Sequence, residues 1–365
     1  MVHMLKRLAT NEIQEELAYL IEGALETVEE LFDALYATLG EAEITEGVRM
    51  YIQKDDHWLT KIEKLKSQLE HMGDLLVFEH ELFTVDIYEL NIIDGYLDEL
   101  VFAMNLLLTQ NVIYWLETKD GYMQVIVMPH FIQDFMEKHV WTQHIPYIFS
   151  SATLSNNGNF TYFKKSLGMK EALQFSVASP YDYEEKMRII FHISDEASRV
   201  RKVQEYLEKT KGRTLLLFPI TEQLKHFKQS FKKSEYEFEI LFEGDQEISS
   251  LVSYFQNHES SVLCAEHLWE GLDVPGSSLS QVINWDLPFP PHDPVFDSFR
   301  RAADDAFLEV DLPYMLLRIR QGIGRLIRTA DDQGDVVIFF DKDSYTNYAK
   351  YIKDVLPRKV ETIQS

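Results

Sequence analysis

Short β-rich runs alternate with amphipathic helical segments over the second half of the chain, and this alternation constrains the fold more than any other feature. Strands are expected at residues 188–193, 214–218, 238–242, 261–264, 281–285 and 335–340. Helices are expected among them at residues 196–209, 222–232, 247–256 and 313–328. Strands that are separated by helices predict a parallel α/β sheet.

The first third of the chain has the periodicity of helices. Apolar residues recur at intervals of three and four along stretches that begin at Leu17, Trp58 and Ile93. Such stripes predict amphipathic helices that bury one face. A stand-alone coiled coil needs about three to four sustained heptads, and each stripe is shorter. A helical domain over residues 1–108 is therefore the favoured interpretation.

A different pattern begins after these helices. Two strands are expected at Val112–Trp115 and Met123–Met128, with Lys119-Asp120-Gly121 as the turn between them. A further short apolar strand is expected at Tyr147–Ser150.

Composition narrows the function classes. Hydrophobic residues make up 45% of the 365 residues, which is enough for a buried core, and the net charge of −25 argues against a general polyanion-binding surface. The first 100 residues hold 23 acidic and 7 basic residues, a net of −16. Cys264 is the single cysteine and is expected to be buried; it excludes an iron–sulfur cluster or four-cysteine zinc site within this chain. No apolar run approaches the ~18 residues of a membrane span, so a cytoplasmic location without a membrane partner is expected.

The strongest chemical signal is the run Gln321-Gly322-Ile323-Gly324-Arg325-Leu326-Ile327-Arg328. A helix through this run would place Gln321, Arg325 and Arg328 on one face. Two guanidiniums and an amide presented together suit the phosphates of a nucleotide, where charge builds up in the transition state. The glycines would let this helix approach its neighbour closely.

Two further runs follow expected strands. Leu268–Gly276 contains Glu270, Gly271 and Asp273, and carboxylates at the carboxyl end of a parallel strand lie where open α/β sheets bind ligands. Ser151 and Thr153 follow the strand at Tyr147–Ser150, where hydroxyls can couple a phosphate site to a neighbouring site or can simply cap the backbone.

In this order, the three runs resemble motifs III, V and VI of the DinG/XPD branch of superfamily 2 helicases. The segments Asn284–Phe289 and Pro291–Pro294 are similar to the Leu-Pro-Phe…Asp-Pro stretch of that family. The resemblance covers about residues 110–357 and implies an α/β fold with a RecA-like parallel sheet of the P-loop NTPase type. It divides the chain into an all-α arch-like domain at 1–108, the remainder of a first RecA-like domain at 109–180 and a complete second RecA-like domain at 181–365.

The resemblance also implies a parent activity, which is ATP-driven translocation on single-stranded DNA. ATP and magnesium would be its cofactors, and an N-terminal motor half of the same protein would be a partner. The implied roles are arginine fingers for Arg325 and Arg328, orientation of phosphate or water for Gln321, a nucleotide cleft lined by Glu270, Gly271, Asp273 and Gly324, and coupling of hydrolysis to movement for Ser151 and Thr153.

Half of such a catalytic site is missing from this sequence. No Gly-Lys dipeptide occurs, so there is no phosphate-binding loop, and there is no Asp-Glu-x-His box. Asp195-Glu196 imitates that box but fits a helix N-terminus. We therefore expect that this chain alone hydrolyses no ATP and holds no metal. Candidate DNA contacts are Lys164, Lys165, Arg199, Arg201 and Lys202, of which the last three fit a solvated face equally well.

Two other functions stay open. The family usually has Leu-Phe-Thr-Ser where this chain has Leu217-Phe218-Pro219-Ile220-Thr221, and Ala265-Glu266-His267 stands where small or hydroxyl residues are usual. These departures favour a non-catalytic module, derived from a helicase, that binds nucleic acid or protein. The intact arginine pair argues against it. A third interpretation, an acidic helical interaction protein, rests on residues 1–108.

Overall fold

The computed structural model describes residues 15–39, 47–52, 55–78, 87–143, 145–151, 153–155, 158–231, 236–271, 274 and 279–364. The chain divides into two compact units. Unit 1 comprises Met1–Gln143 together with His292–Phe299, and unit 2 comprises His144–Pro291 together with Arg300–Ser365.

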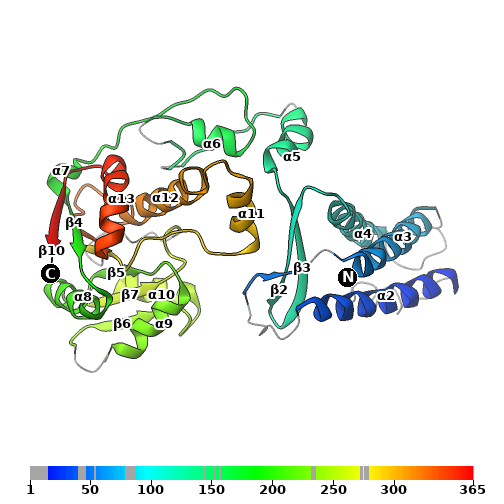
Figure 1. The fold of residues 1–365 in the computed structure, drawn as a ribbon, viewed down its shortest axis with the longest axis horizontal. Coiled ribbons are helices and arrows are strands. Elements are labelled where there is room, and N and C mark those ends of the chain that lie inside the picture. Colours follow the sequence, from blue (N-terminus) through cyan, green and yellow to red (C-terminus); the bar gives the residue numbers. More distant parts are fainter. Residues whose placement is uncertain are drawn as a thin grey trace. The chain divides into compact units, whose positions relative to one another are not determined.

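Unit 1 combines three long helices with a small antiparallel sheet (Figure 1). The helices are α2 (Glu15–Leu39), α3 (Asp56–Phe78) and α4 (Ile87–Leu107). The strands are β1 (Met50–Tyr51), β2 (Val112–Lys119) and β3 (Tyr122–Pro129), followed by the short helices α5 (Ile132–His139) and η2 (Trp141–Gln143). The predicted hairpin is confirmed: β2 pairs with β3 and Asp120-Gly121 forms the turn, both residues with positive φ.

The core of unit 1 contains the apolar stripes that the sequence predicted. Leu17, Trp58 and Leu97 are among the buried residues that α2, α3 and α4 contribute to one cluster. Leu116 of β2 belongs to the same cluster, so the hairpin packs on the helices. This compact unit therefore continues to residue 143, beyond the expected boundary at residue 108.

Unit 2 is built from alternating strands and helices. Its strands are β4 (Met187–Ile193), β5 (Thr214–Leu217), β6 (Glu239–Phe242), β7 (Ser261–Ala265), β8 (Gln281–Asn284), β9 (Gly334–Phe340) and β10 (Val360–Gln364). Its helices are α6 (Thr161–Ser166), α7 (Tyr183–Lys186), α8 (Glu196–Thr210), α9 (Thr221–Ser230), α10 (Ile248–Asn257), the π-helical turn η4 (Phe307–Asp311), α12 (Leu312–Ile323) and α13 (Lys342–Val355). Helix α11 (Pro294–Ala302) contributes residues to both units.

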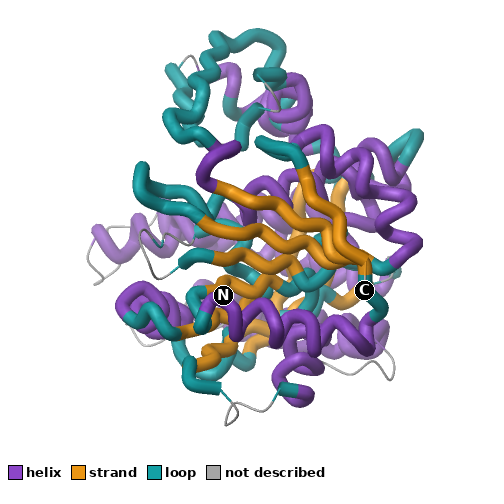
Figure 2. Tube along the Cα trace, turned by 90° about the vertical axis from the view of Figure 1, so that its left-hand side faces the viewer, coloured by secondary structure: helices purple, strands orange, loops and turns teal. Residues whose placement is uncertain are grey.

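The expected parallel sheet is confirmed. Its strands follow the order β10-β4-β9-β8-β5-β7-β6, every pair is parallel, and the strands run side by side in Figure 2. Both faces are covered: α10, α12 and α13 contribute to the apolar cluster on one face, and α8 and α9 to the cluster on the other. Burial on both faces explains why the strands read as continuous apolar runs. Cys264 is buried in β7, as predicted.

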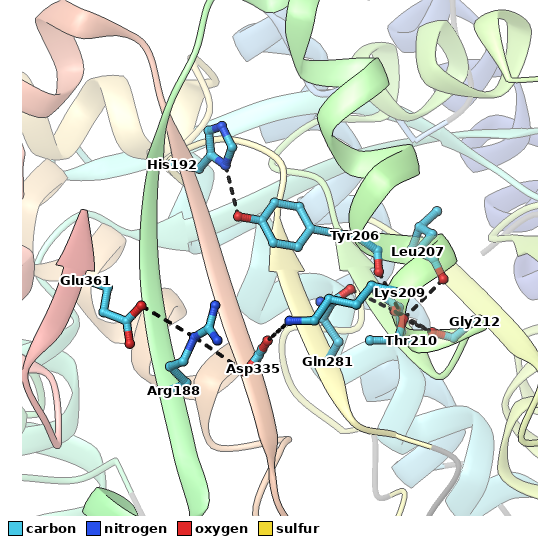
Figure 3. A network of polar contacts seen from close by, with 11 residues as sticks. Arg188, His192, Tyr206, Leu207, Lys209, Thr210, Gly212, Gln281, Asp335 and Glu361 are labelled. Carbon is cyan, nitrogen blue, oxygen red and sulfur yellow. Dashed lines mark hydrogen bonds and ion pairs between the residues drawn. The ribbon is translucent and has the colours of Figure 1, made fainter. Parts of the chain in front are cut away.

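A polar network holds the amino ends of several strands (Figure 3). Arg188 lies 3.9 Å from Asp335 and 3.6 Å from Glu361, and Lys209 lies 3.4 Å from Asp335. Nearby, the Tyr206 hydroxyl lies 3.0 Å from Nδ1 of His192, and burial raises the pKa of Tyr206 to about 12. These contacts join strands of the sheet to each other and to α8, so we assign them a structural role.

One predicted strand is wrong. Residues 145–150 have no regular secondary structure, and Ile148 is 93% exposed. An isolated apolar run cannot form a strand without a neighbour that pairs with its backbone groups, and no described strand pairs with this segment.

Candidate functional site

The loops at the carboxyl ends of β5 and β7 bring together much of what the sequence singled out. After β7, Leu268 and Trp269 turn inward and are buried, whereas Glu270 and Gly271 remain exposed. The indole N–H of Trp269 donates to the carbonyl of Phe218 at 3.2 Å, which ties this loop to the end of β5. Gly271 has φ +77°, a conformation that favours glycine.

Helix α12 packs closely on this loop. Pro313 lies in its first turn, and Met315, Ile319, Gly322 and Ile323 are buried. A Cβ atom on Gly322 would lie 3.1 Å from Cδ1 of Leu217 and 3.3 Å from the ring of Trp269. The expected close approach through a glycine is therefore confirmed at Gly322.

The functional side chains around the end of α12 contact the loop after β7. Nε2 of Gln321 donates to the Glu270 carboxylate at 3.0 Å, and Nε of Arg325 donates to the carbonyl of Trp269 at 3.1 Å. Arg325 is half-buried, so its guanidinium is held at the edge of the sheet without being removed from solvent.

The prediction that Arg325 and Arg328 share the face of one helix is wrong. Helix α12 ends at Ile323, and Gly324 is its C-cap. Beyond it, Leu326 and Ile327 are buried and the backbone N–H of Arg328 donates to Asp332 at 2.7 Å. Burial of Leu326 and Ile327 stabilises the chain more than a further turn of helix would. The backbone therefore leaves the helix, and Arg325 and Arg328 lose their helical spacing.

Two arginines within α12 contact this region although the sequence pattern did not point to them. Nη1 of Arg320 donates to the carbonyl of Ser155 at 2.9 Å, and burial lowers the pKa of Arg320. The guanidinium of Arg318 lies 5.6 Å from the centre of the Trp269 ring, a cation–π contact. Their spacing of two along a helix puts them on different faces, so the sequence alone did not connect them with one site.

The residues at which this chain departs from the family pattern after β5 and after β7 lie close together. The hydroxyl of Thr221 donates to the carboxylate of Glu266. The carboxylate of Glu243 accepts from the backbone N–H groups of Glu266 and His267 at 2.6 and 3.0 Å, and it lies 3.0 Å from Nδ1 of His267. The end of β6 thus contributes a carboxylate that the sequence did not point to.

Electrostatic shifts follow from these contacts. Hydrogen bonding to Glu243 raises the pKa of His267, while burial opposes the rise. Burial alone would raise the pKa of Glu243, but the hydrogen bonds from His267 and from the backbone lower it. The contact therefore favours the charged forms of both side chains at the carboxyl edge.

The remaining candidates lie in different places. Ser151 and Thr153 hydroxyls are 3.1 Å apart, and Asp273 lies outside the described residues. Lys164 and Lys165 lie in α6, and Arg201 is exposed on α8. Lys202 pairs with Glu205 at 2.9 Å.

Arg199 takes a structural position. Its side chain is 3% exposed, and Nη1 donates to the carbonyl of Trp285 at 2.9 Å and lies 3.4 Å from Asp286. The guanidinium also stacks over the Trp285 ring. A guanidinium held in the interior cannot reach a phosphate, so Arg199 is not available for a contact with DNA.

Comparisons with known proteins identify a helicase C-terminal domain in this chain. The family model for the helicase C-terminal domain matches residues 203–359. The probable ATP-dependent helicase YpvA of Bacillus subtilis is 44% identical over 358 residues, which cover 97% of this chain and 55% of the relative. The ATP-dependent DNA helicase YoaA of Haemophilus influenzae is 28% identical over 263 residues, which cover 68% of this chain and 41% of the relative.

A solved XPD helicase has the same fold. It aligns with a TM-score of 0.54 at 16% identity, over 99% of this chain and 64% of the solved chain. The chain matches the C-terminal region of DinG/XPD-like superfamily 2 helicases. It spans about half the length of the curated relatives that it matches. The matched domain contains α12, the loop after β7 and therefore the contacts of Gln321 and Arg325.

Two further findings concern metal ions and membranes. Among the described residues, no group of three or more histidine, cysteine or acidic side chains could hold a metal ion. No helix in that part of the chain is both long and apolar enough to cross a membrane.

Proposed function

We propose that this chain is the C-terminal part of a DinG-like ATP-dependent DNA helicase and that it supplies arginine fingers and part of the DNA track. The observation that carries this proposal is the anchoring of Arg325 to the Trp269 carbonyl beside the Gln321–Glu270 pair. A guanidinium at this edge of the sheet has the charge and the planar fork that suit a phosphate.

The proposed domain roles follow the family. Residues 181–365 act as the second RecA-like domain, residues 109–180 complete the first one, and residues 1–108 form the arch. ATP and magnesium bind to the upstream motor half, which this chain lacks. Arg325 and Arg328 reach the γ-phosphate from this side, and Gln321 orients it. The cleft is lined by Glu270, Gly271, Asp273 and Gly324. Ser151 and Thr153 couple hydrolysis to movement.

Arg325 provides the decisive test, in a complete protein that contains both motor halves. Arg325→Ala should lower ATP turnover by at least ~10²-fold without a change in melting temperature, because arginine fingers contribute ~10³–10⁵ in kcat in other NTPases. Arg325→Lys should not restore turnover fully, since a point charge cannot reproduce the planar fork. The same measurements on Arg328→Ala test the second finger.

Arg188→Ala serves as the matched control, because Arg188 is ion-paired at the opposite, amino edge of the sheet. It should leave turnover unchanged. Wild-type turnover in Arg325→Ala would remove the finger role. Equal losses of turnover and melting temperature would instead mean that Arg325 braces the domain.

A non-catalytic binding module is the second candidate. The observation that favours it is the bond between Thr221 and Glu266, which occupies a hydroxyl at the carboxyl edge of β5 and adds a carboxylate there. If this candidate is right, Arg325→Ala will leave the activity of the complete protein unchanged, whereas Glu266→Ala will alter its binding to nucleic acid.

A further inference from the structure

Helix α4 presents a row of exposed aromatic and aliphatic side chains. Tyr88 is 71% exposed, Ile92 41%, Tyr96 54% and Phe102 51%. At 3.6 residues per turn these four fall within a sector of about 120° and span about 21 Å along the axis. The opposite face is the buried one, with Leu90, Ile93, Leu97, Met104 and Leu107 in the core of unit 1.

The exposed row continues onto α5. The ring of Phe102 lies 6.3 Å from the ring of Phe135, and Phe131, at the N-cap of α5, is 46% exposed. We refer to Tyr88, Ile92, Tyr96, Phe102 and Phe131 as the aromatic row. Five large exposed apolar side chains on one sector of α4 and at the N-cap of α5 are more than the scattered single apolar residues of an ordinary surface. Tyrosine and phenylalanine are also enriched where proteins bind one another.

The charged side chains of α4 all have one sign. Helix α4 contains Glu89, Asp94, Asp98 and Glu99 and no lysine or arginine, and the single lysine of α5, Lys138, lies in the last turn of that helix, at the end opposite to Phe131. Asp98 and Glu99 are exposed, and within the described part of the chain neither forms an ion pair. Burial and the neighbouring Asp98 raise the pKa of Asp94. This surface is therefore an apolar strip with unneutralised carboxylates beside it.

We propose that the aromatic row is a docking surface for a basic amphipathic segment of another protein. Apolar side chains of such a segment cover the rings, and its lysines or arginines meet Asp98 and Glu99 and stack on the tyrosines. The charge excludes other occupants. A phosphate backbone or an anionic membrane would be repelled by the carboxylates, and a second copy of this acidic chain would bring like charge to the same surface.

The length of the row fits a helix of about four turns, or a shorter extended segment. This docking surface lies in unit 1 and does not depend on the ATP chemistry proposed for unit 2. It gives the acidic helical region a role of its own, as a point of attachment.

A defined probe tests the proposal. Binding of a fluorescein-labelled amphipathic peptide of lysine and leucine is followed by fluorescence anisotropy. A lysine–serine peptide of equal length and charge, which has no leucine, serves as the control peptide. The lysine–leucine peptide should bind more tightly, and Tyr96→Ser combined with Phe102→Ser should weaken it about tenfold or more, as expected for central aromatic residues. Tyr19→Ser is the control, since Tyr19 is 77% exposed on helix α2, which is more acidic than α4; it should change nothing.

Three results would overturn the proposal. They are equal binding of both peptides, an equal loss with Tyr19→Ser, or a dimer that dissociates in the Tyr96→Ser and Phe102→Ser variant. Hydrogen exchange on the unmodified chain provides a measurement that does not depend on the variants folding. The lysine–leucine peptide should protect α4 and α5; protection elsewhere without protection of α4 would also contradict the proposal.

Discussion

Trp269 connects three parts of the carboxyl edge through three different groups. Its indole N–H donates to Phe218, its carbonyl accepts from Arg325, and its ring lies beneath the guanidinium of Arg318. Gly322 packs on the same ring. The position of Arg325 therefore depends on one buried tryptophan, even though the two residues are distant in sequence.

We expect Trp269→Phe to lower the free energy of unfolding by about 1 kcal/mol, because the Phe218 carbonyl loses its donor while most of the packing remains. Trp269→Ala should cost about 3–5 kcal/mol through loss of the ring. Denaturant titration followed by circular dichroism measures both. Tyr351→Phe, at an exposed residue of α13, provides the baseline. A Trp269→Phe variant as stable as this control would show that the hydrogen bond contributes nothing.

The His267–Glu243 pair predicts a local dependence on pH. Hydrogen bonding raises the pKa of His267 above the usual value of about 6.5. Since the folded-state pKa is raised, the stabilisation is complete below that usual value and is lost as pH rises through the raised one.

Glu243→Gln should return the pKa of His267 toward its usual value and flatten the fall in melting temperature over this range. The measurement is an NMR titration, with His267→Gln identifying the resonance. A His267 pKa that Glu243→Gln leaves unchanged would contradict the pairing.

At the scale of elements, glycines decide how closely strands and loops approach. Gly334 begins β9, and a Cβ atom there would lie 2.0 Å from the carbonyl oxygen of Ser280. That oxygen is backbone and cannot move aside as a flexible side chain could. The register of β9 beside β8 therefore requires glycine at this position.

Gly334→Ala should destabilise unit 2 by about 3 kcal/mol or more, because backbone must shift to relieve the contact. Gly244→Ala is the matched control. Gly244 has φ +90° but open space around the added Cβ, so it should cost only about 1 kcal/mol of backbone strain. Thermal and denaturant unfolding of the two variants give the comparison. Equal costs would mean that the close approach of β9 to Ser280 is not tight.

At the scale of the whole molecule, the chain carries two separate cores and one side of a proposed catalytic site. Unit 1 buries its helices and hairpin in one cluster, whereas unit 2 buries both faces of its sheet. The sequence contains no Gly-Lys dipeptide. The arginines and the glutamine are thus present without a phosphate-binding loop in the same chain.

We expect this chain alone to hydrolyse no ATP above background, with or without single-stranded DNA. It should bind single-stranded DNA weakly, with affinity that falls as salt rises by about 0.7 log units per log unit of salt for each phosphate contact. Lys164→Ala with Lys165→Ala should reduce that slope, and Lys209→Ala, at the amino edge of the sheet, should not. DNA-stimulated turnover that Arg325→Ala abolishes would contradict the first expectation, and salt-independent binding the second.

Local patterns determined most of the elements. Six of the seven strands of unit 2 and its helices α8, α9 and α10 were predicted to within a few residues, because strands buried on both faces are short apolar runs and the helices between them have a polar side. The predicted helix at 313–328 ran past the end of α12, and helices α6, α7, α11 and α13 were not predicted. The stripes that begin at Leu17, Trp58 and Ile93 likewise identified the helices of unit 1, and Asp120-Gly121 identified the hairpin turn. Strand β10 was not predicted, since Val360–Gln364 is largely exposed and lacks an apolar run.

Tertiary structure decided what the local patterns could not. Only packing ends α12 at Ile323, because Leu326 and Ile327 turn into the core and carry Arg325 onto the Trp269 carbonyl. Only packing buries Arg199, because its place in the sequence of α8 does not distinguish it from a solvent-exposed arginine. Glu243 reaches His267 because β6 lies beside β7 in the sheet. The spacing of residues along the sequence does not determine the order of the strands. The sequence alone thus determined the elements, their type and the motifs at their ends, whereas contacts between distant residues decided which side chains meet.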